Sequence, residues 1–199
     1  MKTIKMNSFK TISTITLALL LLLTISCTSS SEKKSETTDT STDVSKIETP
    51  KIDIQTAVLS NNIEAIQQHI KAGTDLNTKD AMTGSTPLIT AVSFNKKEIT
   101  KALIEAGADL NLKNNDGSTA LHSAAFFCRT ELVQALINAG SDQSLRNNFG
   151  ATAKESVMGP FDTIKPIYEM LQQQLAPMGL QMDLDHIEKT RPTIASMLK

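Results

Sequence analysis

Cysteine and histidine are the residue types with which this chain of 199 residues could most readily do chemistry, and both are scarce. The two cysteines, Cys27 and Cys128, are too few for a multi-disulfide scaffold or a zinc site with four thiolates. The three histidines lie far apart. Asp183, Asp185 and His186 do lie together, but this pattern is more typical of a solvated turn at a helix start. We therefore expect no metal and no cofactor.

The remaining composition argues against two further classes of protein. The formal net charge is −1, whereas a nucleic-acid-binding protein should present a basic face. The chain has no Ser-His-Asp order, no phosphate-binding glycine loop and no carboxylate pair that recurs at a glycine turn. We therefore expect neither a nucleic-acid-binding protein nor an enzyme. Spatial triads can hide from sequence, so an enzyme with an unrecognised site remains the alternative.

Cys27 stands at the end of a distinctive N-terminal segment. Lys2, Lys5 and Lys10 precede an apolar run that is densest at residues 17–23, and small residues follow. This layout is typical of a secretory signal peptide, and the apolar run is shorter than the roughly 20 residues that span a bilayer. The sequence predicts that residues 1–26 are removed. Their loss takes away three basic residues and no acidic ones, which leaves a net charge of −4.

The end of this segment, Leu-Thr-Ile-Ser before Cys27, resembles the lipobox of bacterial lipoproteins. That family prefers Leu where Thr24 stands. The resemblance implies that the Cys27 thiol receives a diacylglycerol, that the chain is cut before it, and that the new amino group is acylated. Several acyl chains would hold the protein firmly to a membrane. A plain secretory signal with a chance cysteine is the alternative.

The same resemblance bears on location within the bacterial cell envelope. Thr28 follows Cys27, so the Asp that marks inner-membrane retention in some two-membrane bacteria is missing. The resemblance therefore favours the outer membrane over the inner one. Residues 27–51 are rich in Ser and Thr and hold only two clearly apolar residues, Val44 and Ile47. We expect a disordered tether there, serving either as a spacer from the membrane or as a permissive linker.

Glycines repeat at a fixed interval in the main body of the chain. Gly84, Gly117 and Gly150 are 33 residues apart, as are Gly107 and Gly140. The residues around them repeat as well, with Gly-Ser-Thr-Pro-Leu, Gly-Ser-Thr-Ala-Leu and Gly-Ala-Thr-Ala in turn. A period of this size predicts a solenoid in which one helical unit stacks on the next.

These repeats resemble ankyrin repeats, whose unit is a short turn, two antiparallel helices and a loop. The resemblance implies an all-α ankyrin-repeat solenoid over residues 52–175, with a C-terminal helical cap at 176–199. We expect four units, at 52–83, 84–116, 117–149 and 150–175. Gly159, Pro160 and Pro166 interrupt the last one. Its helices should be irregular or start afresh at Pro166.

Individual residues support this unit on physical grounds. Thr86 and Thr119 stand where a helix N-cap belongs, and Pro87 suits the first helical position. His122 occupies the place of a histidine that, in ankyrin repeats, makes structural hydrogen bonds between units. We expect that role for it.

The turn between the two helices of a unit usually holds Gly in that family. Here the place is taken by Asn61, Asn95 and Cys128. Asn tolerates the left-handed backbone region, but Cys128 is less natural there. It is either a buried small residue or a redox-responsive thiol.

Ankyrin repeats present a groove formed by the ends of the first helices and by the loop tips. Phenylalanines fall on the first of these places, and aromatic residues are enriched in interface cores. We expect them to anchor a protein partner, with polar contacts from the tips. The candidate partner-binding residues are Phe94, Phe126, Phe127, Lys113, Asn115 and Asp116. One phenylalanine of the 126–127 pair turning into the core is the alternative.

The predicted function is that of a membrane-anchored ankyrin-repeat lipoprotein that acts as a protein-interaction module in the envelope. Two versions remain open, an assembly adaptor and an inhibitor or immunity-type binder. The alternative of a different class is an envelope enzyme or a redox-responsive protein that uses Cys128 or an unrecognised site.

Overall fold

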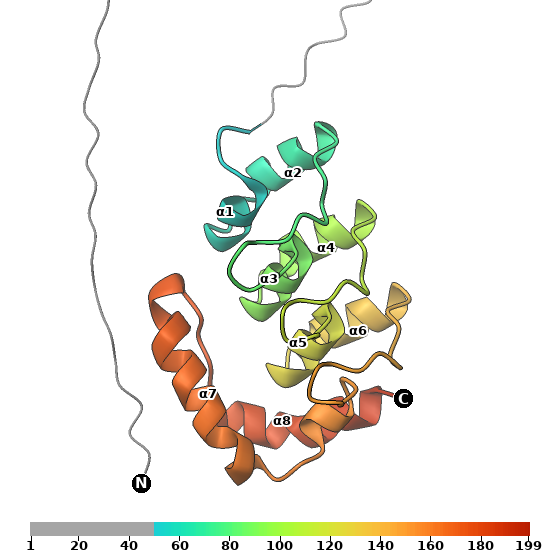
Figure 1. Cartoon of the computed structure of the whole chain (residues 1–199), viewed down its shortest axis with the longest axis vertical. Coiled ribbons are helices and arrows are strands. Elements are labelled where there is room, and N and C mark those ends of the chain that lie inside the picture. Colours follow the sequence, from blue (N-terminus) through green and yellow to red (C-terminus); the bar gives the residue numbers. More distant parts are fainter. Residues whose placement is uncertain (1–49) are drawn as a thin grey trace, which may run out of the picture. The chain divides into compact units, whose positions relative to one another are not determined.

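The computed structural model describes residues 50–199, which contain eight α-helices, two short 3-10 helices and no strand (Figure 1). The predicted all-α class is confirmed. Residues 1–49, including the predicted signal peptide, Cys27 and most of the predicted tether, lie outside the described residues. Among the helices at 50–199, none is both long and apolar enough to cross a membrane.

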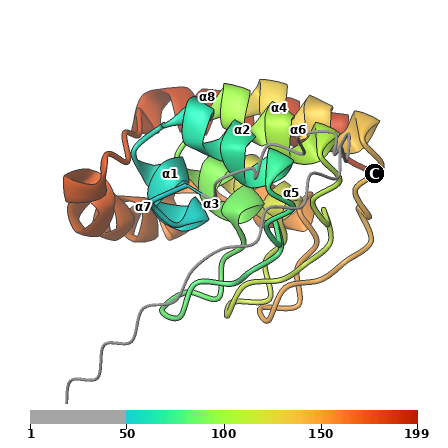
Figure 2. The same ribbon diagram turned by 90° about the horizontal axis from the view of Figure 1, so that it is seen from above.

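Six of the helices form three pairs that stack on one another. Helices α1, α3 and α5 make one layer, and α2, α4 and α6 make the layer behind it (Figures 1 and 2). The pairs are α1 (Ile54–Leu59) with α2 (Ile63–Lys71), α3 (Pro87–Ser93) with α4 (Lys97–Glu105), and α5 (Ala120–Phe126) with α6 (Thr130–Asn138). Ala91 and Ala124 are fully buried and let the helices approach closely.

Threonine and a left-handed turn set the limits of each first helix. Thr86 and Thr119 cap α3 and α5, and their side chains accept hydrogen bonds from the backbone of the third helical residue. After the helix, Asn61, Asn95 and Cys128 have φ values of +55°, +55° and +51°. The three positions predicted for the turn therefore adopt the left-handed region, in which Asn is better tolerated than Cys.

Between the pairs, the chain runs out into long loops, which we call fingers and define as residues 74–86, 107–119 and 140–152. Figure 2 shows the three fingers extending side by side from the helical layers. The finger at 74–86 has one extra residue before its glycine, as the sequence predicts. Gly84, Gly117 and Gly150 have φ between +66° and +77°, a conformation that favours Gly.

Neighbouring fingers are joined by hydrogen bonds. The backbone nitrogen of Asn115 donates to the carbonyl of Thr83 at 2.8 Å, and that of Asn148 donates to Asp116 at 2.9 Å. Their side-chain amides reach the same way, from Asn115 to the Met82 carbonyl at 3.0 Å and from Asn148 to the Asn115 carbonyl at 2.9 Å. Each finger is thus held to the one before it by both backbone and side chain.

The chain leaves the repeat pattern after Gly150. A 3-10 helix, η1 (Glu155–Val157), stacks on α5 where a fourth first helix would lie. Then follow α7 (Phe161–Leu175), the 3-10 helix η2 (Ala176–Met178) and α8 (Leu184–Met197). We call residues 158–199 the C-terminal arm.

Helix α7 does not start afresh at Pro166, so that expectation is wrong. The helix begins at Phe161 and contains Pro166. A proline inside a helix removes one backbone hydrogen bond, but Phe161 and Ile164, on the N-terminal side of Pro166, pack against the core. Their burial offsets the lost bond. Helix α8 packs against η1, α5 and α6, with Ile187 and Ile194 buried.

The finger contacts generate a stability prediction. A Cβ atom on Gly117 would lie 2.7 Å from the backbone nitrogen of Asn148, whereas one on Gly150, the matching residue of the last finger, would meet nothing within 4 Å. Both residues have positive φ. Gly150→Ala should therefore cost about 1–2 kcal/mol from backbone strain alone, and Gly117→Ala should cost roughly 2 kcal/mol more from the clash. Urea unfolding of both variants measures the difference, and equal losses would contradict the close finger contact.

Candidate protein-interaction surface

The predicted partner-binding residues fall into two groups at opposite ends of the first helices. Lys113, Asn115 and Asp116 lie in the finger that precedes α5. Phe94 is the C-cap of α3, Phe126 is the last residue of α5, and Phe127 is its C-cap. The structure therefore does not gather the six residues into one site, and each group has its own surroundings.

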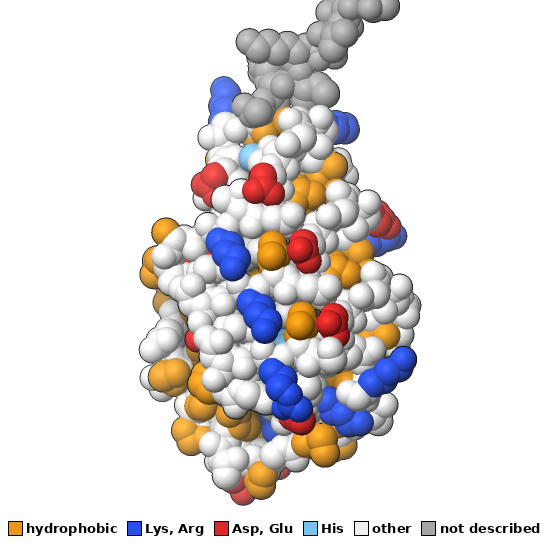
Figure 3. Space-filling model, turned by 45° about the vertical axis from the view of Figure 1, so that its right-hand side comes forward, with side chains coloured by type: hydrophobic (Ala, Val, Ile, Leu, Met, Phe, Trp, Pro, Cys, Tyr) orange, Lys and Arg blue, Asp and Glu red, His pale blue; other side chains and the backbone are white. Residues whose placement is uncertain are grey.

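In the finger group, two of the three residues bond to neighbouring fingers. The Lys113 Nζ donates to the carbonyl of Arg146 at 2.8 Å, just as the Lys79 Nζ donates to the carbonyl of Lys113 at 2.6 Å. Asn115 bonds back to the preceding finger, as described above. The Asp116 side chain is exposed. Figure 3 shows one face of the stacked repeats, where acidic and basic side chains are interspersed rather than gathered into a patch of one sign.

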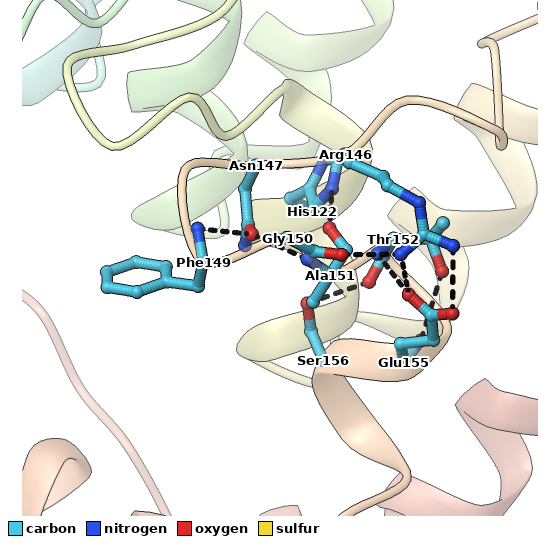
Figure 4. Close-up of polar contacts among 9 residues, drawn as sticks. All are labelled: His122, Arg146, Asn147, Phe149, Gly150, Ala151, Thr152, Glu155 and Ser156. Atoms are coloured by element: carbon cyan, nitrogen blue, oxygen red, sulfur yellow. Dashed lines mark hydrogen bonds and ion pairs between the residues drawn. The ribbon is translucent and has the colours of Figure 1, made fainter.

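Two large apolar side chains stand exposed at the fingertips. Met82 is 88% exposed and Phe149 is 81% exposed. The Phe149 ring projects away from the polar contacts around Gly150 (Figure 4). Its backbone is held in place because the Asn147 Oδ1 accepts from the nitrogens of Phe149 and Ala151 at 3.0 and 3.1 Å. The tip is thus a supported position for an exposed aromatic ring.

Asp80 supports the tip that carries Met82 in the same manner. Its Oδ1 accepts from the nitrogens of Met82 and Thr83 at 2.9 and 2.8 Å, and its Oδ2 accepts from the nitrogen of Ser85 at 2.8 Å. Sequence reasoning treated the tips as polar and did not propose Met82 or Phe149 as anchors. The signal was an apolar residue just before the turn glycine, where the middle finger has Asp116.

The phenylalanine group is less accessible than the sequence predicts. Phe127 is only 8% exposed, so the expectation that it lies open in the groove is wrong. Its ring packs edge-on against Phe126, with centroids 5.1 Å apart. Phe94 and Phe126 are half-buried. The alternative, in which one phenylalanine of the 126–127 pair turns inward, describes what Phe127 does.

Phe126 is covered by the C-terminal arm. The Tyr168 ring lies 4.5 Å from the Phe126 ring, and the Tyr168 hydroxyl donates to the Phe126 carbonyl at 2.7 Å. The buried Arg191 then donates to the Tyr168 oxygen at 3.2 Å and to the Gly159 carbonyl at 2.9 Å. Burial raises the pKa of Tyr168 to about 12, although the nearby Arg191 charge opposes this, so the hydroxyl stays protonated as a donor.

His122 has the structural role that the sequence predicts. Its Nδ1 lies 2.9 Å from the Thr119 Oγ1 and accepts from the Thr119 nitrogen at 3.3 Å, which leaves the proton on Nε2. Nε2 lies 3.1 Å from the Ala151 carbonyl in the next finger. Burial lowers the pKa of His122, although the Ala151 bond opposes this. His122 thus links two successive units in its neutral form (Figure 4).

The acidic residues near His186 serve a helix start. The Asp183 Oδ1 accepts from the backbone nitrogen of His186 at 3.0 Å and caps α8. Residues 50–199 contain no group of three or more His, Cys, Asp or Glu side chains that could hold a metal ion.

Cys128 is buried beneath α8. It is 3% exposed, and its Sγ lies 3.6 Å from the Ile187 carbonyl. Burial raises the pKa of the Cys128 thiol to about 11, although the nearby Arg191 and Arg129 charges oppose the rise. A reactive thiol needs a depressed pKa and access to solvent, and Cys128 has neither.

Comparison with known proteins agrees with this architecture. Residues 54–147 match the family model for ankyrin repeats in three copies. Among solved structures, the chain is similar to the one titled "Crystal structure of the ankyrin repeat domain of Bcl-3: a unique member of the IkappaB protein family", with 33% sequence identity and a TM-score of 0.51. The match covers 52% of this chain and 45% of that one, so this chain spans less than half of its length. No curated protein sequence matches the chain.

The burial of Cys128 generates a reactivity prediction. In a Cys27→Ser variant, Cys128 is the only thiol. With a pKa of about 11, only about one thousandth of it would be thiolate at pH 8. We expect a disulfide reagent such as DTNB to leave the folded variant unlabelled and to label it fully in denaturant. Rapid labelling of the folded protein would contradict the buried position and restore the redox alternative.

Proposed function

We propose that this chain, whose residues 54–147 form ankyrin repeats, acts as a protein-interaction module that holds its partner at the fingertips. The observation that carries the proposal is the display of Met82 and Phe149 on braced turns at the two outer fingers. Met and aromatic residues are enriched at protein interfaces. Large apolar side chains that are held exposed mark an interaction site more often than chance does.

The hydrogen bonds between fingers support the same proposal energetically. Binding costs conformational entropy when loops must be ordered at the interface. The fingers are already held to one another through Asn115 and Asn148, so little ordering remains to be done. Asp116 lies between the two apolar tips with an exposed carboxylate and is proposed as a polar contact. Lys113 and Asn115 are proposed to act by positioning the finger.

A substitution series tests the fingertip proposal. The full chain would be extracted from host membranes with detergent, and the protein that remains bound would be identified. We expect Met82→Ser and Phe149→Ser each to weaken binding of that protein at least about tenfold, because each removes a large apolar contact. Met170→Ser is the matched control, since Met170 is also exposed but lies on α7. Equal binding by all three variants in a titration would contradict the proposal.

We further propose that the protein is held to a bacterial membrane through lipid on Cys27, with the outer membrane as the favoured location. The sequence up to Cys27 supports this through its resemblance to a lipobox. Residues 28–49 then give the repeats reach from the membrane. The adaptor and inhibitor versions both fit such an anchor, and they differ in whether a bound partner keeps its activity. The redox alternative loses its main residue, because Cys128 is buried.

A single substitution tests the anchor. Cys27→Ser removes the only atom that could accept the diacylglycerol, so the variant should move from the membrane pellet to the soluble fraction. Mass spectrometry of the parent protein should show the added lipid on an N-terminal Cys27. A Cys128→Ser variant controls for loss of a thiol as such. A Cys27→Ser protein that stays in the pellet would contradict lipid anchoring and favour a different attachment.

A further inference from the structure

We propose that a recess between the repeats and the C-terminal arm binds an acidic segment of the protein partner. This inference rests on the proposed interaction function but concerns a different surface from the fingertips. The recess has a volume of about 630 Å³, and its lining includes Phe94, Lys96, Arg129, Met182 and Asp183.

The walls of the recess come from two parts of the chain. One wall is formed by the turns between helices, with Phe94 and Lys96 from the α3–α4 turn and Arg129 from the α5–α6 turn. The other wall is the segment 179–183 that leads from η2 to α8. An Arg129 Nη2 donates to the Gln181 carbonyl at 3.1 Å and joins the two walls.

Two cations of the repeats line this recess without an acidic partner. Lys96 and Arg129 lie 33 residues apart, at the same position of successive units. Within residues 50–199, neither forms an ion pair, and the buried Arg129 Nε has no hydrogen-bond partner. Asp183 is the one acidic residue in the lining, and its Oδ1 is engaged at the start of α8. The lining therefore carries an excess of positive charge.

The backbone adds to this positive field. Lys96 and Arg129 are the N-caps of α4 and α6, each nine residues long, and neither helix has a side-chain cap. Helix α2, in contrast, is capped by the Asn62 side chain. Uncapped backbone N–H groups and the helix dipole both favour a negative ligand. A carboxylate in the recess would therefore meet side-chain cations and two helix ends together.

The recess also has an apolar part, which selects among anions. The half-buried ring of Phe94 and the buried side chain of Met182 lie in the same lining as the cations. A small anion such as phosphate would use the cations alone. A peptide in which carboxylates alternate with apolar side chains would use both kinds of surface. Charge complementarity and this mixed lining point to an acidic, partly apolar segment of a protein.

Peptide binding to the full chain tests the inference. The probe is a short fluorescein-labelled peptide in which Glu alternates with Leu, and its control is the matching Lys–Leu peptide. Fluorescence anisotropy should show binding of the Glu–Leu peptide that weakens as salt is raised, with no comparable binding of the Lys–Leu peptide. Lys96→Glu should weaken the affinity about tenfold, because it reverses one of the two cations.

Lys101→Glu is the matched control, since it makes the same charge change on α4 at a well-exposed side chain outside the lining. It should leave the peptide affinity within about twofold of the parent, and circular dichroism should show both variants folded. Equal effects of Lys96→Glu and Lys101→Glu would overturn the inference. So would complete displacement of the peptide by millimolar inorganic phosphate, which would indicate a plain anion site.

The result is separable from that for the fingertips. If Lys96→Glu leaves capture of the natural partner unchanged while Phe149→Ser abolishes it, the recess is not a partner site and the fingertip proposal stands. If both variants weaken capture, both surfaces contact the partner.

Discussion

The hydrogen bonds between neighbouring fingers are the contact on which the arrangement of the repeats depends. A single helix pair cannot bury its apolar face, so each unit needs a neighbour at a defined distance and angle. Asn115 and Asn148 set that register at the fingers, and they fit only because Gly84 and Gly117 have no Cβ atom. The same register carries the helices into contact and places the fingertips in a row. Stability and binding geometry therefore share one set of contacts.

The C-terminal arm solves a different problem, which is the exposed end of the stack. A fourth regular unit would leave its own face open, whereas η1 and α8 cover α5 and α6 and the chain then stops. Helix α7 forms an excursion between them and returns onto the end of α5, where Tyr168 meets Phe126. The arm thereby uses aromatic surface that repeats of this kind could offer to a partner. What it leaves open are the fingertips and the recess that it helps to form.

The sequence predicts the repeating part of this structure well and the arm poorly, for physical reasons. Gly117 and Thr119 report a local backbone need, a positive φ and a helix cap, which is legible from residue type and period alone. Phe94 and Phe127 occupy equivalent places 33 residues apart, yet Phe94 is half-buried and Phe127 is buried. The difference arises because the arm packs on the last unit only. No pattern in residues 117–149 reveals which distant segment will cover them.

Cys128 shows how the arm also reaches back into the choice of residues in the repeats. Asn61 and Asn95 suit the left-handed turn, and a third Asn would carry less backbone strain than Cys at φ +51°. At the third turn, however, the side chain faces the Ile187 carbonyl beneath α8 and is almost fully buried. An Asn amide there would bring two donors and an oxygen into a space with one acceptor, and each unpaired buried polar group costs about 1–3 kcal/mol. A thiol is small, tolerates burial and can use that single acceptor weakly. The cysteine that resembles a redox site is thus explained by the packing of the chain's own end against its last complete repeat.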